Sequence, residues 1–324
     1  MRIFLLVLCL SLSAPSLLAR ERLWEPPRYG AGAQLAAEFD PKRTWLLAFG
    51  LLEWKEASTW APFSKLNRRD QLIAQAFLDL GLPSRQVILL QDRAATGKAW
   101  RAAVKQTLAQ TRPGDTLVFY YAGHGWHDSR MFYMVPYDGY ATDSLYSQKE
   151  LTEQLEAHFA GDRVLLVADC CHSGSLANWV KRGGHRKSYA ALTSSKASET
   201  STGNWTFSDC FLDALRGEVY LDANHDGVLS LAEVGQELGR QMEFVEKQKA
   251  RTQYSEHFRG RTEFVKVSGT NRPGEGELVR VRAEGDLWPA RVVERGRRGV
   301  LVHWLGNYEN YQDTWVKPGQ LKSR

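Results

Sequence analysis

Two short segments combine residue types that can carry nucleophilic chemistry. The first is Leu117-Val-Phe-Tyr-Tyr-Ala-Gly-His-Gly125, and the second is Val164-Leu-Leu-Val-Ala-Asp-Cys-Cys-His-Ser-Gly174. A thiol such as that of Cys171 becomes an effective nucleophile when an imidazole such as that of His124 acts as its proton partner. The neighbouring glycines permit tight turns and let a substrate backbone approach exposed amides. The two segments therefore predict thiol-based covalent chemistry.

Other interpretations of the same residues stay open. Buried cysteines are often inert core residues, and a loop histidine often only satisfies a carbonyl group. The types of Cys170, Cys171, His172 and His124 also suit zinc, although adjacent ligands are awkward to arrange around one ion. His172 and His127 are close enough in sequence to compete with His124 as the base.

The elements that position these segments follow from hydrophobic periodicity. Near-continuous apolar runs alternate with amphipathic stretches, which indicates a mostly parallel sheet with helices on both faces. The expected strands are 44–51, 86–90, 116–121, 163–168 and 189–193, and the expected helices are 70–80, 97–111, 148–159 and 207–216. The fold class is therefore α/β. The carboxyl ends of parallel strands share one edge, so we expect both segments to meet there.

The two loops resemble those of the caspase-like superfamily of cysteine peptidases, and within it most closely those of metacaspases. The matching motifs are Tyr121-Ala-Gly-His-Gly125 and Asp169-Cys-Cys-His-Ser-Gly174. Their separation, 171 − 124 = 47, agrees with the ~50 residues between histidine and cysteine in caspases. Weaker similarity at Leu66-Asn-Arg-Arg-Asp70 extends the resemblance over roughly residues 44–240.

The resemblance implies a cysteine endopeptidase that needs no cofactor for catalysis and acts on a protein or peptide. Cys171 is then the nucleophile, His124 stabilises charge and protonates the leaving amine, and the amides of Gly125 and Cys171 hold the oxyanion. Cys170 is expected to point into the fold, because successive residues of an extended segment alternate in direction. The motif assigns no third catalytic residue. A non-catalytic binding protein on the same frame is the alternative.

Asp70 and Asp169 correspond to the family's acidic residues for binding Arg or Lys before the cleaved bond. Ala122 stands where the family has serine, which weakens that inference. Arg68 and Arg69 instead suggest selection of an acidic (Asp) residue, as in true caspases. Asp70 also suits a helix cap.

A second motif, Asp222-Ala-Asn-His-Asp-Gly-Val-Leu-Ser-Leu-Ala-Glu233, fits the twelve-residue EF-hand loop. The oxygen ligands of a Ca²⁺ ion are expected from Asp222, Asn224, Asp226, Val228, Ser230 and Glu233. A well-capped turn is the other interpretation of this loop.

A segment rich in Gly and Pro, 268–276, predicts a linker, and residues 277–324 contain short β-rich runs typical of a small SH3-like β-barrel. This part resembles Tudor or chromo-barrel domains. The aromatic residues that either form a ligand cage or fill the small core are Trp288, Trp304, Tyr308, Tyr311 and Trp315. A peptide or cell-envelope ligand is expected for the barrel.

The remaining composition sets the cellular context. Residues 1–19 have the outline of a signal peptide, which predicts a secreted or periplasmic protein, and residues 20–43 form an N-terminal extension before a peptidase domain at 44–267. No later run is long enough to span a membrane. The net charge of +5 is dispersed, which does not favour nucleic-acid binding. Outside the signal segment, Cys170, Cys171 and Cys210 are too few and too closely placed for a disulfide scaffold.

Overall fold

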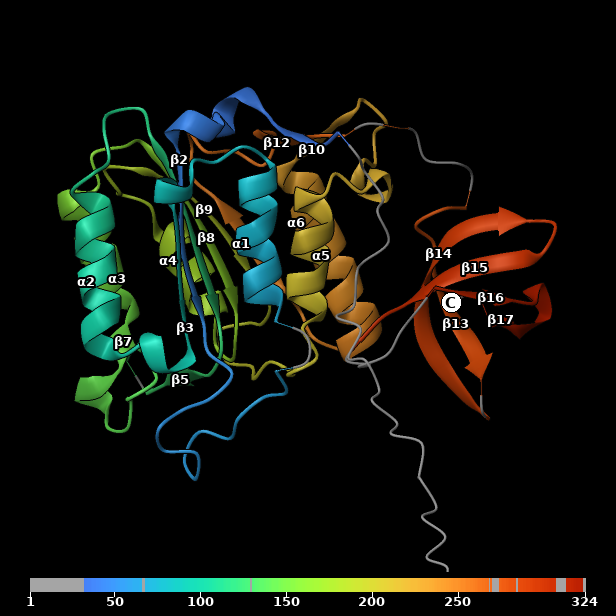
Figure 1. Cartoon of the computed structure of the whole chain (residues 1–324), viewed down its shortest axis with the longest axis horizontal. Coiled ribbons are helices and arrows are strands. Elements are labelled where there is room, and N and C mark those ends of the chain that lie inside the picture. Colours follow the sequence, from blue (N-terminus) through green and yellow to red (C-terminus); the bar gives the residue numbers. More distant parts are fainter. Residues whose placement is uncertain are drawn as a thin grey trace, which may run out of the picture.

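The computed structural model describes residues 32–65, 68–128, 130–267, 269, 274–283, 285–306 and 313–322. Its centre is a six-stranded sheet in the order β11-β9-β8-β4-β2-β3 (Figure 1). All neighbouring strands are parallel except β11, which runs antiparallel to β9. The strands are β2 (Thr44–Gly50), β3 (Val87–Gln91), β4 (Thr116–Ala122), β8 (Arg163–Asp169), β9 (Ser188–Thr193) and β11 (Arg251–Tyr254). The predicted mostly parallel sheet is confirmed.

Helices cover both faces of this sheet. They are α1 (Arg69–Asp79), α2 (Gly97–Leu108), α3 (Gln148–His158), α4 (Gly174–Arg182), α5 (Thr206–Leu215) and α6 (Leu231–Gln241). The strands divide their side chains between two cores because alternate residues point to opposite faces. One core joins the sheet to α1, α5 and α6, and the other joins it to α2, α3 and α4. This division gives the site two distinct sides.

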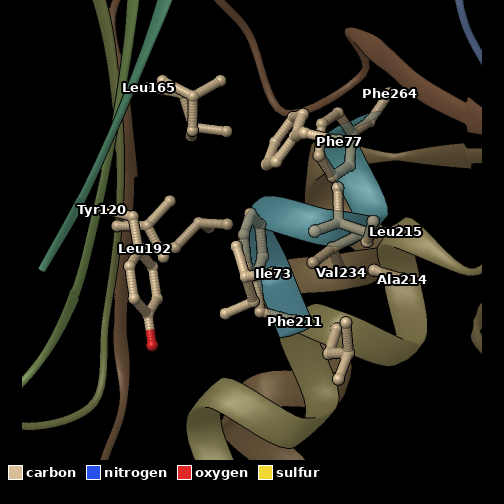
Figure 2. Packing of buried hydrophobic residues seen from close by; sticks show 14 of the residues in the cluster. Ile73, Phe77, Tyr120, Leu165, Leu192, Phe211, Ala214, Leu215, Val234 and Phe264 are labelled. Carbon is tan, nitrogen blue, oxygen red and sulfur yellow. The ribbon is translucent and has the colours of Figure 1, made fainter. Parts of the chain in front are cut away.

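Figure 2 shows the first of these cores. Tyr120, Leu165 and Leu192 project from three neighbouring strands toward Ile73 of α1 and Phe211 of α5. All five side chains are fully buried. Burial of a side chain of this size stabilises the fold by about 2–3 kcal/mol, so this layer holds α1 and α5 firmly against the sheet.

Two small sheets flank the main one. The first contains β5 (Gly125–His127), β6 (Phe132–Met134) and β7 (Tyr146–Ser147), and the second contains β1 (Gln34–Leu35), β10 (Val228–Ser230) and β12 (Glu263–Lys266). Strands of two to four residues show too little alternation to be predicted from sequence. Two helical segments were also not predicted from the sequence: α4, whose start coincides with the cysteine loop, and the π-helical turn Met242–Glu246.

The C-terminal strands form a separate antiparallel sheet in the order β16-β15-β14-β13-β17, at the right in Figure 1. They are β13 (Leu278–Ala283), β14 (Asp286–Gly296), β15 (Gly299–Trp304), β16 (Thr314–Val316) and β17 (Leu321–Lys322). Within the described residues no pairing joins the two edge strands, so this is an open sheet and the expected closed barrel is not observed.

The expected aromatic cage falls only partly within the described residues. Trp304 packs against the small core and Trp288 donates to the carbonyl of Ala283, whereas Trp315 is 37% exposed. Tyr308 and Tyr311 lie outside the described residues, as do the predicted signal segment 1–19 and most of the predicted linker. Among the helices that the structure describes, none combines the length and apolar character needed to cross a membrane.

Candidate active site

The register of the sheet brings the two predicted loops to the same level. β4 pairs with β8 so that Ala122 lies opposite Asp169, and His124 and Cys171 each follow two residues later. The loops touch: a Cβ atom at Gly125 would lie 1.9 Å from the carbonyl oxygen of Cys171. Only glycine permits this approach, so the close contact explains the residue type at position 125.

Cys171 differs from the other two described cysteines in exposure. It is partly exposed, whereas Cys170 and Cys210 are buried. The backbone N–H of Ser201 donates to the Cys171 sulfur at 3.2 Å, which holds the thiol against the 199–202 segment. Burial raises the pKa of the Cys170 thiol well above its usual range, so this neighbour is kept as an unreactive thiol. The expectation that Cys170 points inward is confirmed.

The ring of His124 is held by a backbone carbonyl. Its Nε2 lies 2.8 Å from the oxygen of Ala61. Because a carbonyl only accepts, Nε2 must carry the proton, and in the neutral ring Nδ1 is then the unprotonated nitrogen. Burial lowers the pKa of His124, while the bond to Ala61 partly opposes this effect. The imidazole is therefore neutral at pH 7 and able to accept a proton.

Aromatic side chains from the segment after β2 surround this imidazole. The His124 ring centroid lies 4.4 Å from that of Trp54, 4.7 Å from Phe63 and 5.5 Å from Trp60. Sequence reasoning missed this segment and the Ala61 carbonyl. The concentration of aromatics without helix or strand periodicity in 54–63 was the signal that could have indicated a packed functional loop.

The competing histidines have other surroundings. His172 has a φ of 61°, an uncommon conformation for a non-glycine residue, and its Nδ1 is 2.9 Å from the oxygen of Ala197. Its ring centroid is 5.5 Å from that of the exposed His127. The contacts of these two rings are with each other and with Ala197, on the side of α4, whereas the His124 ring lies among the aromatic residues of 54–63.

The predicted carboxylate pair lies on the α1 and α5 face of the same sheet edge. Gly50, Ala122 and Asp169 are level on three adjacent strands. Asp70 of α1 packs over this row, since a Cβ atom at Gly50 would lie 1.9 Å from its Oδ2. The structure thus brings Asp70 and Asp169 to one end of the sheet, as the sequence predicted.

Asp169 is a buried carboxyl group with neutral hydrogen-bond partners. Its Oδ2 accepts from the Ser208 hydroxyl at 2.7 Å and from the Ser208 amide at 3.2 Å. Burial raises the pKa of Asp169 from 3.8 to about 6, and the bonds from Ser208 and Ser194 limit this rise. The carboxyl group is therefore mostly ionised at pH 7 and titrates near the neutral range.

Asp70 already has a guanidinium partner inside the chain. Arg68 donates to both Asp70 oxygens, at 2.9 and 3.2 Å, and also to Asp92 and to the carbonyl of Gly50. Gln91 donates to Asp70 as well, at 2.7 Å. Arg69 pairs with Asp209 instead. Asp70 makes no cap bond to the helix, so the capping interpretation is not observed.

Neither predicted metal site is assembled in the described residues, where no three or more His, Cys, Asp or Glu side chains converge to hold an ion. For the zinc alternative, Cys170 faces the α2, α3 and α4 core. In the EF-hand-like loop, Glu233 accepts from the amides of Ala223 and Asn224 and from Ser230. The last two predicted ligands thus form the capping box of α6.

The first half of the EF-hand-like loop is folded by its own side chains. Asp222 accepts from the amides of Asp226 and Gly227, Asn224 accepts from the amide of Asp226, and Asp226 accepts from the amide of Val228. These carboxylates keep further lone pairs, so the oxygen donor set that calcium prefers is present.

Comparison with known proteins identifies the family. The sequence profile of the caspase domain matches residues 68–269, which include the loops that carry His124 and Cys171. Among solved structures, a Geobacter sulfurreducens protein is 16% identical with a TM-score of 0.46, covering 72% of this chain and 96% of its own. The Drosophila initiator caspase Dronc is 9% identical with a TM-score of 0.45, covering 70% and 83%. The search of curated proteins found no match.

The profile match spans more than half of the chain and includes the sheet edge that carries His124 and Cys171. This protein therefore belongs to the caspase-domain family, a family of cysteine peptidases.

Proposed function

We propose that this protein is a cysteine endopeptidase that uses Cys171 as nucleophile and His124 as its proton partner. His124 Nδ1 accepts the thiol proton, and the sulfur attacks the carbonyl carbon of the scissile bond. The amides of Gly125 and Cys171 stabilise the resulting oxyanion. The imidazolium then gives its proton to the leaving amine, and water hydrolyses the acyl-enzyme to restore the thiol.

One observation carries this proposal. The two family loops leave adjacent parallel strands in register, and Gly125 contacts the backbone of Cys171. Groups fixed on a rigid sheet edge need little reorganisation to react. The Ala61 carbonyl supports the same mechanism, because it sets the tautomer of His124 and orients its ring.

The substrate preference that we propose is Arg or Lys before the cleaved bond. Asp70 and Asp169 lie together at this end of the sheet, and Asp92 and Asp209 lie beside them, paired with Arg68 and Arg69. Arg68 and Arg69 are already engaged with chain carboxylates, which disfavours the alternative of an acidic (Asp) residue at that position. A substrate guanidinium reaching Asp70 has to displace Arg68.

The test is cleavage of matched fluorogenic peptides that end in Arg, Lys, Asp or Asn. We expect Arg and Lys peptides to be cleaved and Cys171→Ala to lose all turnover, with Cys170→Ala as the matched control that keeps it. An electrophilic Arg-mimicking probe should label Cys171 alone. If neither cleavage nor labelling occurs, while partner binding survives in Cys171→Ala, the chain is a binding protein on a peptidase frame.

We also propose that the 222–233 loop binds Ca²⁺ through Asp222, Asn224, Asp226, Val228, Ser230 and Glu233, in the range of about 10⁻⁴–10⁻³ M typical of exported modules. Glu233 has to leave the amides of Ala223 and Asn224 to reach the ion. Calorimetric titration should detect binding in the native protein and none in Glu233→Gln.

Export to a secreted or periplasmic location rests on residues 1–19, and N-terminal sequencing of the mature protein tests it. For the C-terminal sheet, a Tudor-like fold with a peptide or envelope ligand remains our proposal. The exposed Trp315 and Leu287 support a contact surface there.

A further inference from the structure

A cavity lies beside the loops that carry His124 and Cys171, on the opposite face of the sheet from Asp70 and Asp169. It is a cavity of about 340 Å³ between the β5–β6 segment, α3 and α4. Met131, Phe132 and Trp179 form its apolar part. α3 and α4 pack on the face of the sheet opposite to α1 and α5. The cavity and the Asp70–Asp169 pair therefore lie on opposite faces of the same end of the sheet.

The lining of this cavity is cationic. Arg130, Lys149, Arg182 and His127 line it, and no Asp or Glu does. Lys149 has only an exposed partner, Glu153, at 3.7 Å. Arg130 and Arg182 have no ion pair within the part of the chain that the structure describes. Concave surfaces lined by one sign of charge concentrate their potential, so this cavity attracts anions.

Neutral donors complete the cavity wall. Gln148, Ser175 and Asn178 line it with amide and hydroxyl groups, and Gln148 is only 6% exposed. The cavity thus combines cations, neutral hydrogen-bond donors and apolar side chains. This combination suits a ligand that has a carboxylate on a short aliphatic stem. A second basic cavity lies at the amino-terminal ends of β2 and β4. By contrast, it contains a carboxylate, Asp115, which forms an ion pair with Arg43.

Two contacts and one short sequence separation connect the cavity to the nucleophile. His172 follows Cys171 directly and bonds to the carbonyl of Ala197, which lines the cavity. The ring of His127, another lining residue, lies tilted against that of His172, with the centroids 5.5 Å apart. Ser175 lies four residues after Cys171, in the first turn of α4. In a substrate peptide whose basic side chain lies on the α1 face and whose backbone passes Cys171 at the sheet edge, the residues after the cleaved bond lie near this cavity.

We propose that this cavity binds an acidic side chain, Asp or Glu, of the substrate on the leaving-group side of the scissile bond. The inference rests on the proposed peptidase function and adds a second specificity determinant to it. A preferred substrate then carries opposite charges on the two sides of the cleaved bond, each facing a pocket of the complementary charge.

The test uses internally quenched peptides with Arg before the cleaved bond and either Glu or Gln at each of the three following positions. We expect one Glu peptide to be cleaved with about ten-fold higher kcat/KM than its Gln counterpart, and the ratio to fall as salt increases. Arg182→Gln and Lys149→Gln should bring the ratio close to one. Lys181→Gln, the adjacent cation on α4 that does not line the cavity, is the matched control and should keep it.

Failure of this inference is separable from failure of the peptidase proposal. If the Arg peptides are cleaved but Glu and Gln are equivalent at all three positions, the cavity proposal is wrong and the peptidase proposal stands. If no peptide is cleaved, the peptidase proposal fails. Fluorescence anisotropy of labelled Glu and Gln peptides with Cys171→Ala then decides the cavity: an Arg182-dependent preference for Glu supports it, and equal binding overturns it.

Discussion

At the scale of single residues, the site contains groups whose environment opposes their charge. Asp169 is buried with hydroxyl and amide partners, and His124 is kept neutral by burial. Buried ionisable groups of this kind lower the stability of the folded protein, and they are common at functional sites. Their titration gives predictions with a defined sign.

Asp169→Asn should stabilise the protein at neutral pH. The folded-state pKa of Asp169, about 6, exceeds the usual 3.8, so the wild-type protein loses stability as pH rises from about 4 through 6. A difference of this size corresponds to about 3 kcal/mol, which the neutral amide avoids. Denaturant unfolding at pH 7.5 should show Asn as the more stable variant, with the gap closing toward pH 4. A gap independent of pH would contradict the assignment. Cleavage after Arg should weaken in the same variant.

Arg68→Gln should increase kcat/KM for substrates with Arg before the cleaved bond, by roughly ten-fold. The reason is that a substrate guanidinium no longer displaces an internal one that makes charge-assisted bonds to Asp70. Arg69→Gln is the matched control, because it removes a neighbouring buried guanidinium whose partner is Asp209. If Arg68→Gln instead abolishes cleavage after Asp, Arg68 recognises an acidic substrate residue.

At the scale of elements, the site depends on the approach of two loops that leave neighbouring strands. Gly125 begins β5 immediately after His124, and its Cα faces the Cys171 carbonyl. The row formed by Gly50, Ala122 and Asp169 shows the same dependence on strand register. A shift of one strand by a single residue would separate these groups onto opposite faces.

Gly125→Ala should therefore reduce kcat by about 100-fold or more, since the added methyl group forces the two loops apart and misplacement of about 1 Å has this effect. Steady-state kinetics with an Arg peptide measures the loss. Gly239→Ala is the control: its Cβ would meet nothing within 4 Å in α6, so the activity should persist with slightly higher stability. Comparable activity in the two variants would mean that the loops do not need this contact.

At the scale of the whole molecule, one buried cation connects the C-terminal sheet to the caspase domain. Arg291 of β14 pairs with Asp213 of α5 at 2.9 Å and stacks over the Tyr220 ring at 3.8 Å. Nearby, burial and the charge of Asp213 raise the pKa of Glu218 to about 8, although Arg291 opposes that rise. The sheet is therefore docked through charge as well as through apolar contacts with Phe244.

Arg291→Met should destabilise the protein by about 3 kcal/mol, because it removes the buried guanidinium that pairs with Asp213, a carboxylate only 18% exposed. The measurement is denaturant unfolding together with the rate at which a protease releases the 277–324 fragment. Arg295→Met, on the same strand, breaks only the exposed pair with Glu277 and should cost less than about 1 kcal/mol. Equal effects of the two substitutions would show that docking does not depend on the buried pair.

The sequence by itself determined the five parallel strands of the main sheet, most of the helices and the two loops with His124 and Cys171, since apolar runs and glycine-flanked motifs are local signals. The limits predicted for these five strands differ from the observed ones by at most one residue. The antiparallel strand β11 was not predicted. The short strands, the open form of the C-terminal sheet and α4 were beyond such signals.

Only the tertiary structure decided which partner each functional group has. The Ala61 carbonyl on His124, the Arg68 guanidinium between Asp70 and Asp92, and the cationic cavity beside α4 each join segments that are far apart in sequence. The physical reason is that a side chain's pKa and partner depend on strand register and helix packing, which no local pattern specifies.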